Sequence, residues 1–421
     1  MLRSILASSL FLGSVLAGPD WPQFRGPNGD GHSPAKNVPV KWSDTENVAW
    51  VVNVPGRGWS SPALKDGRIY LTTAVVTDGK PEEDNQADRS LRALCLDAAT
   101  GKAIWDVEVF KQDGATAPAS IHKKNGHASP TALVTDDRVF VHFGHQGTAA
   151  LDRSGRIVWT NRELKYPPQH GNGGSPILVE GKLIFNCDGQ RDPFIAALDA
   201  TTGKIAWRLP RPETEQKQKF AFATCSAFNI DGKMQVISPG AGAVDSFEPA
   251  TGKHLWRVRY EGYSIVPKPI LADGLIYIST AYDTPDMYCI DPKGASGDVT
   301  DTHVKWTNGK RAPMTVAPIV VDGDVYWVTD QGGQVTCADA KTGEIFWCER
   351  VGSRANSAAP LYADGRLYIQ DEDGKCVVLK PGHTYEKIAT NDVKEHGLAS
   401  FAVTDGALFI RTDTKLYRIG K

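Results

Sequence analysis

The chain has 421 residues, and its 47 basic and 49 acidic side chains leave a formal net charge of −2. This balance excludes the strongly basic surface of a nucleic-acid-binding protein and any strong attraction to an anionic membrane. With 41% hydrophobic residues, 41 Gly and 26 Pro, the composition also excludes a disordered or fibrous chain and favours a turn-rich, soluble all-β protein.

Residues 1–17 have the pattern of a secretory signal peptide. An apolar run from Ile5 to Leu16 follows Arg3 and ends at the small pair Ala17-Gly18; it is too short to span a bilayer. We therefore expect cleavage near Ala17 and export to the periplasm or out of the cell, with no transmembrane segment. Residues 18–41 then form an N-terminal extension that we expect to pack on the following domain.

From residue 42 onward the chain repeats. A Trp closes a short apolar strand at intervals of about 40 to 55 residues, and the clearest copies read like Asp97-Ala-Ala-Thr-Gly101-Lys-Ala-Ile-Trp105. The recurring residues are Trp50, Trp105, Trp159, Trp207, Trp256, Trp306 and Trp347. Asp and Thr suit the turn, Gly suits a left-handed position, and Trp is large and flat. We interpret these Trp residues as structural contacts that dock neighbouring repeats, and not as cofactor stackers.

A second repeated feature gives the number of repeats. Each repeat has an acidic-Gly pair, or a close variant, between two β-rich runs, as a two-residue hairpin requires. These pairs are Asp66-Gly67, Asp137-Arg138, Glu180-Gly181, Asp231-Gly232, Asp273-Gly274, Asp322-Gly323, Asp364-Gly365 and Asp405-Gly406. The pattern predicts a single eight-bladed β-propeller of four-stranded antiparallel blades over residues 42–421.

The ends of the repeated region predict how the ring closes. The strand around Trp50 precedes the first hairpin, and the last repeat supplies three strands before the chain stops. We expect the two to share one blade, which leaves no open sheet edge. The seventh repeat ends at Tyr385-Glu-Lys-Ile-Ala-Thr390 without a Trp, so its docking contact is weaker or substituted.

Residues around the inner strands should ring the mouth of a central channel. The predicted ligand-binding set is Arg57, Trp59, His127, Asn172, Tyr263, Arg311, Asp330, Asn356 and His396. A polar mouth with aromatic rings suits a small molecule, a sugar or a peptide, and equally a wet channel with no ligand. His127, His142 and His145 are candidate transition-metal ligands, but they lack a known zinc-site spacing, and we predict no metal and no catalytic residue.

Seven Cys residues are unusual in an exported chain, because an odd number leaves one thiol unpaired. We expect most of them to be small buried hydrophobic residues. A bridge between Cys187 and Cys225 in neighbouring repeats is left open by their spacing.

The repeated Asp-x-x-Thr-Gly-Lys-x-x-Trp run resembles the docking motif of the pyrroloquinoline quinone (PQQ) dehydrogenase-like propellers. The segment Asp20-Trp21-Pro-Gln-Phe24-Arg25 is similar to the opening of secreted PQQ-like repeat proteins of planctomycetes and related bacteria. This superfamily includes quinone enzymes and the non-enzymatic assembly lipoprotein BamB, so the resemblance implies the fold and leaves the function open.

Two functions follow from this resemblance. The first is an exported, non-catalytic binding platform for protein or polysaccharide partners in the cell envelope, monomeric and without a cofactor. The alternative is a quinoprotein oxidoreductase that uses PQQ and Ca²⁺ on alcohols or sugars. The chain lacks the adjacent Cys pair and the haem-attachment motif that the dehydrogenases carry, and it has few long insertions. The binding platform is therefore the interpretation that the sequence favours.

Overall fold

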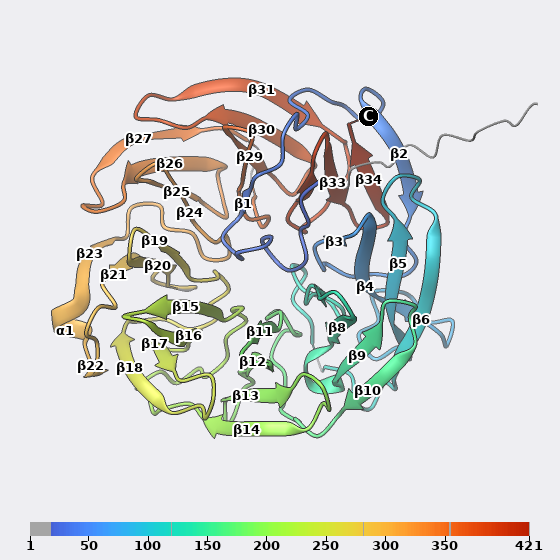
Figure 1. Ribbon diagram of the computed structural model, residues 1–421, viewed down its shortest axis with the longest axis horizontal. Coiled ribbons are helices and arrows are strands. Elements are labelled where there is room, and N and C mark those ends of the chain that lie inside the picture. Colours follow the sequence, from blue (N-terminus) through green and yellow to red (C-terminus); the bar gives the residue numbers. More distant parts are fainter. Residues whose placement is uncertain (1–17, 119, 281, 353–354, 421) are drawn as a thin grey trace, which may run out of the picture.

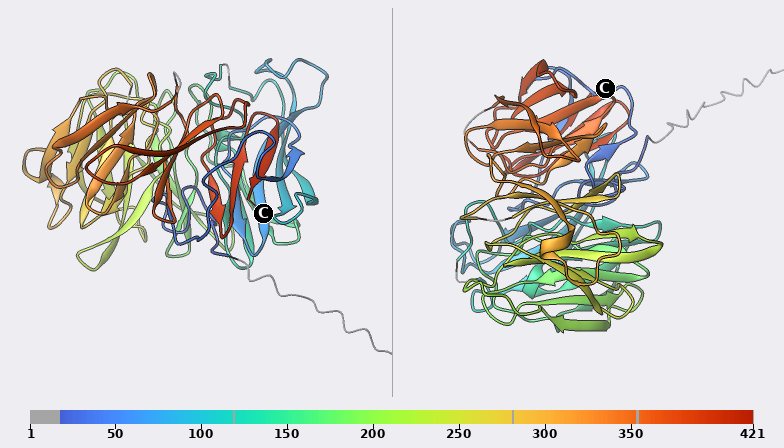
Figure 2. Two further views of the ribbon diagram at one scale, coloured as in Figure 1. Left: turned by 90° about the horizontal axis from the view of Figure 1, so that it is seen from above. Right: turned by 90° about the vertical axis from the view of Figure 1, so that its left-hand side faces the viewer.

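The computed structural model describes residues 18–118, 120–280, 282–352 and 355–420; the predicted signal peptide lies outside these ranges. Within them, eight antiparallel sheets stand around a common centre as the blades of a propeller (Figure 1). Seen edge-on, the ring is a thick disc with loops on both faces (Figure 2). The predicted all-β, eight-bladed fold is confirmed.

Each blade runs from the centre of the ring to its rim, and we number the blades 1 to 8 in chain order. The innermost strands are β3 (Ala63–Lys65), β7 (Leu133–Val134), β11 (Ile177–Val179), β15 (Ser226–Ile230), β19 (Ile270–Ala272), β24 (Ile319–Val321), β28 (Leu361–Ala363) and β32 (Ala402–Thr404). The second strands are β4 (Arg68–Val76), β8 (Arg138–His142), β12 (Lys182–Cys187), β16 (Lys233–Gly240), β20 (Leu275–Ser279), β25 (Asp324–Val328), β29 (Arg366–Gln370) and β33 (Ala407–Arg411).

The outer half of each blade completes the sheet. The third strands are β5 (Arg89–Asp97), β9 (Thr148–Asp152), β13 (Phe194–Asp199), β17 (Ala243–Phe247), β21 (Met287–Ile290), β26 (Gln334–Asp339), β30 (Lys375–Lys380) and β34 (Lys415–Ile419). The rim strands are β6 (Ala103–Gln112), β10 (Ile157–Asn161), β14 (Ile205–Pro210), β18 (His254–Arg259), β23 (Val304–Asn308), β27 (Ile345–Arg350), β31 (Glu386–Asp392) and, in blade 8, β2 (Val48–Asn53).

Acidic-Gly turns join the first two strands of most blades. Asp66 and Gly67, for example, both have positive φ, at 49° and 70°, as the hairpin turn that matches strand twist requires. Blade 2 differs, because β7 ends at Val134 and β8 already begins at Arg138. Arg138, which we expected in the turn, is therefore the first residue of a strand.

The last blade is assembled from both ends of the propeller. Strand β2 pairs antiparallel with β34, with Val51 opposite Tyr417. Blade 8 thus takes its rim strand from the N-terminal side and its other three strands from the C-terminal repeat.

The repeated Trp residues contact the next blade in a uniform way, with one exception. Six indole N–H groups donate to a backbone carbonyl of the following blade at 2.9–3.2 Å: Trp50 to Ala98, Trp105 to Arg153, Trp159 to Ala200, Trp207 to Pro249, Trp306 to Ala340 and Trp347 to Gly382. Trp256 instead donates to Gln235 of its own blade at 2.8 Å. An insertion containing β22 (Gly297–Asp298) and α1 (Thr300–His303) accompanies this difference, since β22 pairs parallel with β18 opposite Trp256.

The seventh blade, which has no Trp of its own, receives one from the N-terminal segment. Ala389 faces Val378 in the register position where Trp347 faces Cys337 one blade earlier. Trp42 fills the space: its ring lies 6.4 Å from that of Tyr368, close to the 6.1 Å between Trp347 and Tyr326. The Trp42 amide also donates to Asn391 Oδ1 at 2.9 Å. The docking contact is therefore substituted by a residue distant in sequence.

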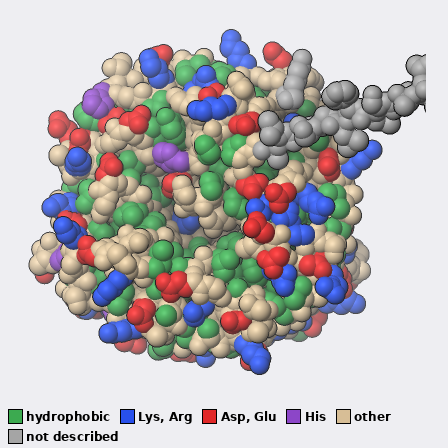
Figure 3. All heavy atoms as spheres, viewed as in Figure 1, with side chains coloured by type: hydrophobic (Ala, Val, Ile, Leu, Met, Phe, Trp, Pro, Cys, Tyr) green, Lys and Arg blue, Asp and Glu red, His purple; other side chains and the backbone are tan. Residues whose placement is uncertain are grey.

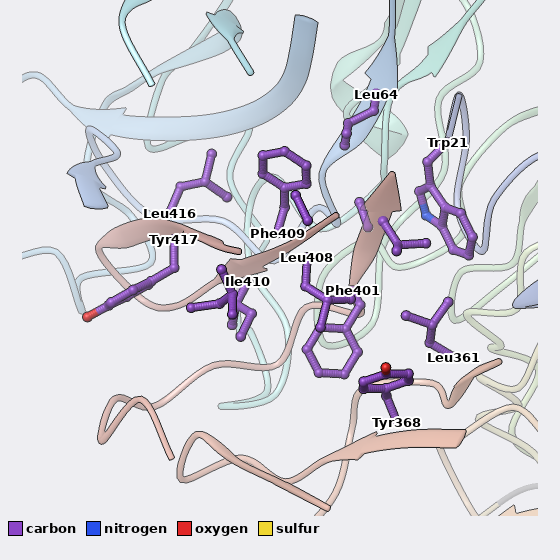
Figure 4. Packing of buried hydrophobic residues seen from close by; sticks show 14 of the residues in the cluster. Trp21, Leu64, Leu361, Tyr368, Phe401, Leu408, Phe409, Ile410, Leu416 and Tyr417 are labelled. Atoms are coloured by element: carbon purple, nitrogen blue, oxygen red, sulfur yellow. The ribbon is translucent and has the colours of Figure 1, made fainter. Parts of the chain in front are cut away.

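Residues 18–41 cross one end of the central channel. Trp21 and Leu64 of blade 1 exchange two backbone hydrogen bonds, and Arg25 donates to the Pro318 carbonyl next to blade 6 at 2.8 Å. Strand β1 (His32–Ser33) pairs parallel with β28 of blade 7. Figure 4 shows Trp21 in the same buried cluster as Leu361 and Phe401. The segment therefore ties together blades on opposite sides of the ring.

The core lies mainly between neighbouring blades, as in the cluster that contains Tyr70 of blade 1 and Val139 of blade 2. All seven Cys residues are free thiols, and all but Cys348 are buried. Burial raises the pKa of Cys95 and of Cys225 to about 11. Cys187 and Cys225 are both buried thiols, so no disulfide joins them.

The surface shows no dominant charge. Basic and acidic side chains interleave over the face seen in Figure 3. In the part of the chain that the structure describes, no helix has the length and apolar character needed to cross a membrane.

Candidate functional site

The centre of the ring holds a cavity of about 960 Å³ that is lined by side chains from all eight blades. Its inner lining has a regular origin, because one residue of every blade, two positions before the innermost strand, faces the cavity. We call these residues the inner ring: Ser61, Thr131, Ser175, Thr224, Lys268, Ala317, Ala359 and Ser400. Five are hydroxyls, two are Ala and one is Lys. Phe24 of the N-terminal segment also lines the cavity.

The five hydroxyls of the inner ring link consecutive blades. Each hydroxyl oxygen accepts a backbone N–H at 2.9–3.1 Å: Ser400 from Ala359, Ser61 from Ser400, Thr131 from Ser61, Ser175 from Thr131 and Thr224 from Ser175. A hydroxyl that accepts in this way keeps its own proton to donate. Among the described residues, none of the five donates that proton to a protein acceptor, so the protons are available to the cavity.

Lys268 takes the inner-ring position in blade 5, between Pro267 and Pro269. The residue is only 4% exposed, and its ammonium has no hydrogen-bond or ion-pair partner in the described part of the chain. Burial, followed by the positive charge of Arg25, lowers the pKa of Lys268 to about 7. A buried, unpaired ammonium that lines a cavity is typical of a functional site.

The wall of the cavity toward the mouth is aromatic on one side. Rings lie in a chain of close contacts, from His170 to Phe220 (5.6 Å), from Phe220 to Tyr263 (5.3 Å) and from Tyr263 to Tyr282 (6.3 Å). Tyr282 is 54% exposed, so the chain of rings extends from the cavity to the surface. Flat apolar rings beside hydroxyl donors suit a ligand that has both faces and polar edges.

Two carboxylates line the mouth, and both already have hydrogen-bond or ion-pair partners within the protein. Asp330 accepts hydrogen bonds from the Met314 amide and the Thr315 hydroxyl, and burial raises its pKa. Glu372 pairs with Lys124 at 2.6 Å. Lys124 follows the rim strand of blade 1, whereas Glu372 belongs to blade 7, so this ion pair narrows the mouth.

The structure places three of the nine predicted binding residues on the cavity. Trp59, Tyr263 and Asp330 line it, and Trp59 donates its indole N–H to the Asn125 carbonyl at 3.1 Å. These three come from blades 1, 5 and 6 and face a common space.

The other six lie outside the cavity lining. Arg57 is half exposed near Glu83, Arg311 donates to Cys348 Sγ, and His396 contacts Asp413 at 2.7 Å. Asn172 accepts from the Tyr166 hydroxyl, Asn356 donates to the Gln370 carbonyl, and His127 contacts Gln112. Their side chains bond to neighbouring residues around the mouth. The channel itself is lined by the inner ring.

The candidate metal ligands are engaged separately. His142 Nδ1 lies 2.8 Å from Thr148 Oγ1, and His145 Nε2 lies 2.8 Å from the Thr116 carbonyl. Burial lowers the pKa of His127 and of His142 to about 3. Within the described ranges, no three His, Cys, Asp or Glu side chains gather in a metal-binding group.

The inner ring escaped the sequence analysis, although a signal was present. In five blades its member directly precedes the Pro that opens the innermost strand: Pro62, Pro176, Pro269, Pro318 and Pro360. Eight of the nine predicted binding residues instead lie two to six positions upstream of the ring member of their blade, and Asp330 follows the second strand of blade 6. Aligning the repeats on each Pro identifies the ring and shows Lys268 as its one charged member.

Eight blades around a lined channel, most of them docked on the next by a Trp of the rim strand, define a PQQ-like β-propeller. A family model described as outer membrane protein assembly factor BamB matches residues 42–296 and 240–381. The chain belongs to this family.

Individual relatives include both enzymes and assembly factors. The chain is 28% identical over 184 residues to quinohemoprotein alcohol dehydrogenase ADH IIB of Pseudomonas putida, covering 41% of this chain and 24% of that protein. It is 20% identical over 328 residues to the outer membrane protein assembly factor BamB of Yersinia pestis, covering 77% of this chain and 68% of that protein. The chain thus spans only about a quarter of the quinone dehydrogenases it matches.

Solved structures confirm the fold. The quinohemoprotein alcohol dehydrogenase of Comamonas testosteroni aligns with a TM-score of 0.66 at 14% identity, covering 96% of this chain and 81% of that one. A europium-containing methanol dehydrogenase aligns with a TM-score of 0.65 at 10% identity, covering 96% and 98%. At these identities the similarity establishes the propeller architecture alone.

The residues present do not fit the Ca²⁺ that the fold resemblance implies beside PQQ. Calcium takes six to eight oxygen ligands, but Asp330 and Glu372 already satisfy a backbone amide, hydroxyls and an ammonium. Each inner-ring hydroxyl oxygen accepts a backbone amide as well. The described lining therefore offers two carboxylates that are both already engaged, beside an uncompensated ammonium that repels a cation.

Proposed function

We propose that this protein is an exported, non-catalytic binding protein of the cell envelope, in which the propeller is the scaffold and the central cavity with its mouth is the binding surface. One observation carries the proposal: the cavity offers hydroxyl donors, aromatic rings and a buried ammonium, while its two carboxylates are held by the chain. Such a set suits the recognition of a ligand that carries flat faces and acceptor oxygens.

The favoured ligand is the end of an envelope polysaccharide. Sugar rings present apolar faces that suit the chain of Phe220, Tyr263 and Tyr282, and their oxygens suit the hydroxyl donors of the inner ring. A protein partner is the second class, supported by the family description. Export rests on the predicted signal peptide of residues 1–17, followed by an extension of residues 18–41 and one monomeric propeller of residues 42–421.

Cavity-filling variants test the proposal. Ala359 belongs to the inner ring, so Ala359→Trp places a large side chain in the cavity, whereas Ile104→Trp adds the same side chain at an exposed position of a rim strand. We expect oligosaccharides prepared from envelope polysaccharide to bind the wild-type protein and Ile104→Trp, and to bind Ala359→Trp at least about tenfold more weakly, in isothermal calorimetry. Equal binding by both variants places the ligand elsewhere and contradicts the proposal.

A quinoprotein oxidoreductase is the second candidate, favoured by the names of the dehydrogenases that the chain resembles. It is tested by titrating the protein with PQQ and Ca²⁺ and by measuring dye-linked oxidation of alcohols and aldoses. We expect neither uptake nor oxidation. Tight PQQ uptake that supports dye reduction and is lost in Asp330→Ala replaces the binding proposal by the enzymatic one.

A further inference from the structure

We infer that the inner end of the cavity is an oxyanion site, which takes a carboxylate, phosphate or sulfate group of the ligand. Lys268 Nζ supplies the charge, and the free hydroxyl protons of the inner ring supply the remaining hydrogen bonds. This inference rests on the proposed function, since it names the chemistry of the ligand that the cavity binds. A polysaccharide that carries acidic groups satisfies both the proposed binding function and the oxyanion site.

The position of Lys268 is fixed by its surroundings. Prolines on both sides restrict the backbone, and Gly29 of the N-terminal segment lies directly against the ammonium. A Cβ on Gly29 would come within 2.1 Å of Lys268 Nζ, and its φ of +70° favours Gly. The ammonium is thus confined between the N-terminal segment and the cavity, and the cavity is the direction that remains open to it.

The inner ring around Lys268 is a set of donors. Each of the five hydroxyl oxygens already accepts one backbone amide and keeps an O–H that it donates to no protein group among the described residues. The remaining members are Ala317 and Ala359, which present methyl groups. These O–H groups and the ammonium suit a ligand that brings acceptor oxygens, and a charged oxyanion gives stronger hydrogen bonds than a neutral group.

The charges nearest to Lys268 leave it uncompensated. Arg25 lies on the N-terminal side and adds positive charge; its Nη2 donates to the carbonyls of Asp30 and Pro318. Asp30 attracts the ammonium but forms no ion pair with it, and its carboxylate accepts the His32 amide. Cys225 donates its thiol proton to Asn186 and remains a neutral thiol, since burial raises its pKa to about 11.

Burial of an unpaired charge is costly, and the pKa of about 7 for Lys268 expresses that cost. An oxyanion seated beside the ammonium removes the cost by pairing the charge, so binding and protonation of Lys268 must be linked. Binding should be strong below pH 7, where the free protein already carries the charge. It should weaken above pH 7, where the ligand must draw in a proton as it binds.

Sulfate is the probe that tests the site, because its charge does not change between pH 6 and pH 9. The purified full-length protein is titrated with sodium sulfate, and separately with sodium acetate, in Tris or bis-Tris chloride at constant ionic strength, and binding is followed by calorimetry. We expect saturable binding of at least one of the two oxyanions at pH 6, and an affinity at least about tenfold lower at pH 9. The stronger of the two identifies the class of acidic group.

Matched variants assign the effect to Lys268. Lys268→Met keeps the length of the side chain and removes its charge; we expect it to lower oxyanion affinity at pH 6 by at least about tenfold and to abolish the pH dependence. Lys102→Met makes the same change at an exposed residue outside the cavity lining and should leave the oxyanion affinity and its pH dependence unchanged. Because the pH dependence is measured on the wild-type protein, the test stands even where Lys268→Met folds poorly.

The outcomes separate this inference from the proposed function. Neutral oligosaccharides that bind the cavity with equal affinity in wild type and Lys268→Met, together with no pH-dependent sulfate or acetate binding, overturn the oxyanion site and leave the binding function in place. PQQ-dependent dye reduction overturns the binding function itself. Equal oxyanion binding by wild type and Lys268→Met also overturns the site, because the binding is then unspecific.

Discussion

At the scale of single residues, position within a repeat decides the role of a side chain more than its type does. The chain has 10 His and 47 basic residues, yet among those that the structure describes, Lys268 is the one that lines the cavity while deeply buried and unpaired. It occupies the inner-ring position that Ser61 and Ser400 occupy in their blades. The hydroxyls accept backbone amides there, whereas an ammonium has no lone pair with which to accept one.

The free energy of unfolding should depend on pH, because the Lys268 ammonium is buried without a partner among the described residues. Lys268 has a folded-state pKa of about 7, lower than the roughly 10.4 of an unfolded chain. Between these values the unfolded state binds one more proton, so the free energy of unfolding rises with pH; below pH 7 both states are protonated and the penalty is constant. We expect Lys268→Met to be more stable than the wild-type protein at pH 7, by an amount about 2 kcal/mol larger than at pH 9.

Urea unfolding at the two pH values measures this difference, in chloride buffers that contain no oxyanion. Lys102→Met is the control, since its charge is exposed and its removal should give the same small change at both pH values. A stability difference for Lys268→Met that does not depend on pH would show that the ammonium is solvated or paired.

At the scale of elements, most blades are docked on the next by a Trp that contacts the turn of its neighbour. The turn glycine is part of the contact: a Cβ on Gly203 would lie 2.4 Å from Trp159 Cε3. The hairpin glycine Gly181 has the same φ of +72°, but a Cβ there meets nothing within 4 Å. Substitutions at Gly203 and Gly181 therefore share the backbone strain of a positive φ, but only the one at Gly203 also crowds a Trp ring.

We expect Gly203→Ala to lower the free energy of unfolding by about 2 kcal/mol more than Gly181→Ala, because overpacking adds to the strain that both share. Chemical denaturation of the two variants beside the wild-type protein gives the difference. Equal losses would mean that Trp159 moves aside without cost and that the docking contact contributes little.

At the scale of the whole molecule, residues 18–53 complete the ring at three places. Strand β2 fills the rim of blade 8, Trp42 fills the docking position that blade 7 lacks, and Arg25 reaches blade 6 across the channel. These contacts join residues more than 290 positions apart, as in the pair of Arg25 and Pro318. Closure of the propeller therefore depends on residues that precede the first hairpin turn.

Removing the substitute Trp tests this role. Trp42 is buried, so Trp42→Ala should cost about 3–5 kcal/mol, as other buried aromatic truncations do. The neighbouring Lys41→Ala alters an exposed side chain and should change stability by less than about 0.5 kcal/mol. Urea denaturation measures both; a loss for Trp42→Ala as small as that of Lys41→Ala would show that blade 7 docks without it.

The fold could be predicted from the sequence because it repeats local information. The Asp-Gly turns and the Trp runs are each specified within about ten residues, and their recurrence fixes the number of blades. The site could be predicted only in part: Trp59, Tyr263 and Asp330 line the cavity, whereas Arg57, His396 and Arg311 face loops and solvent. A residue that lies close to an inner strand in the sequence does not have to point into the channel.

The sequence by itself determined the eight blades, their Trp contacts and the shared last blade, since turn chemistry and strand periodicity act over short distances. Only the tertiary structure decided that Trp42 replaces the absent Trp, that the N-terminal segment crosses the channel, and that Lys268 stands unpaired among hydroxyl donors. These features depend on which residues the closed ring brings together across hundreds of positions. Burial and pairing, which set the charge of Lys268 and the chemistry of the cavity, exist only once the ring has formed.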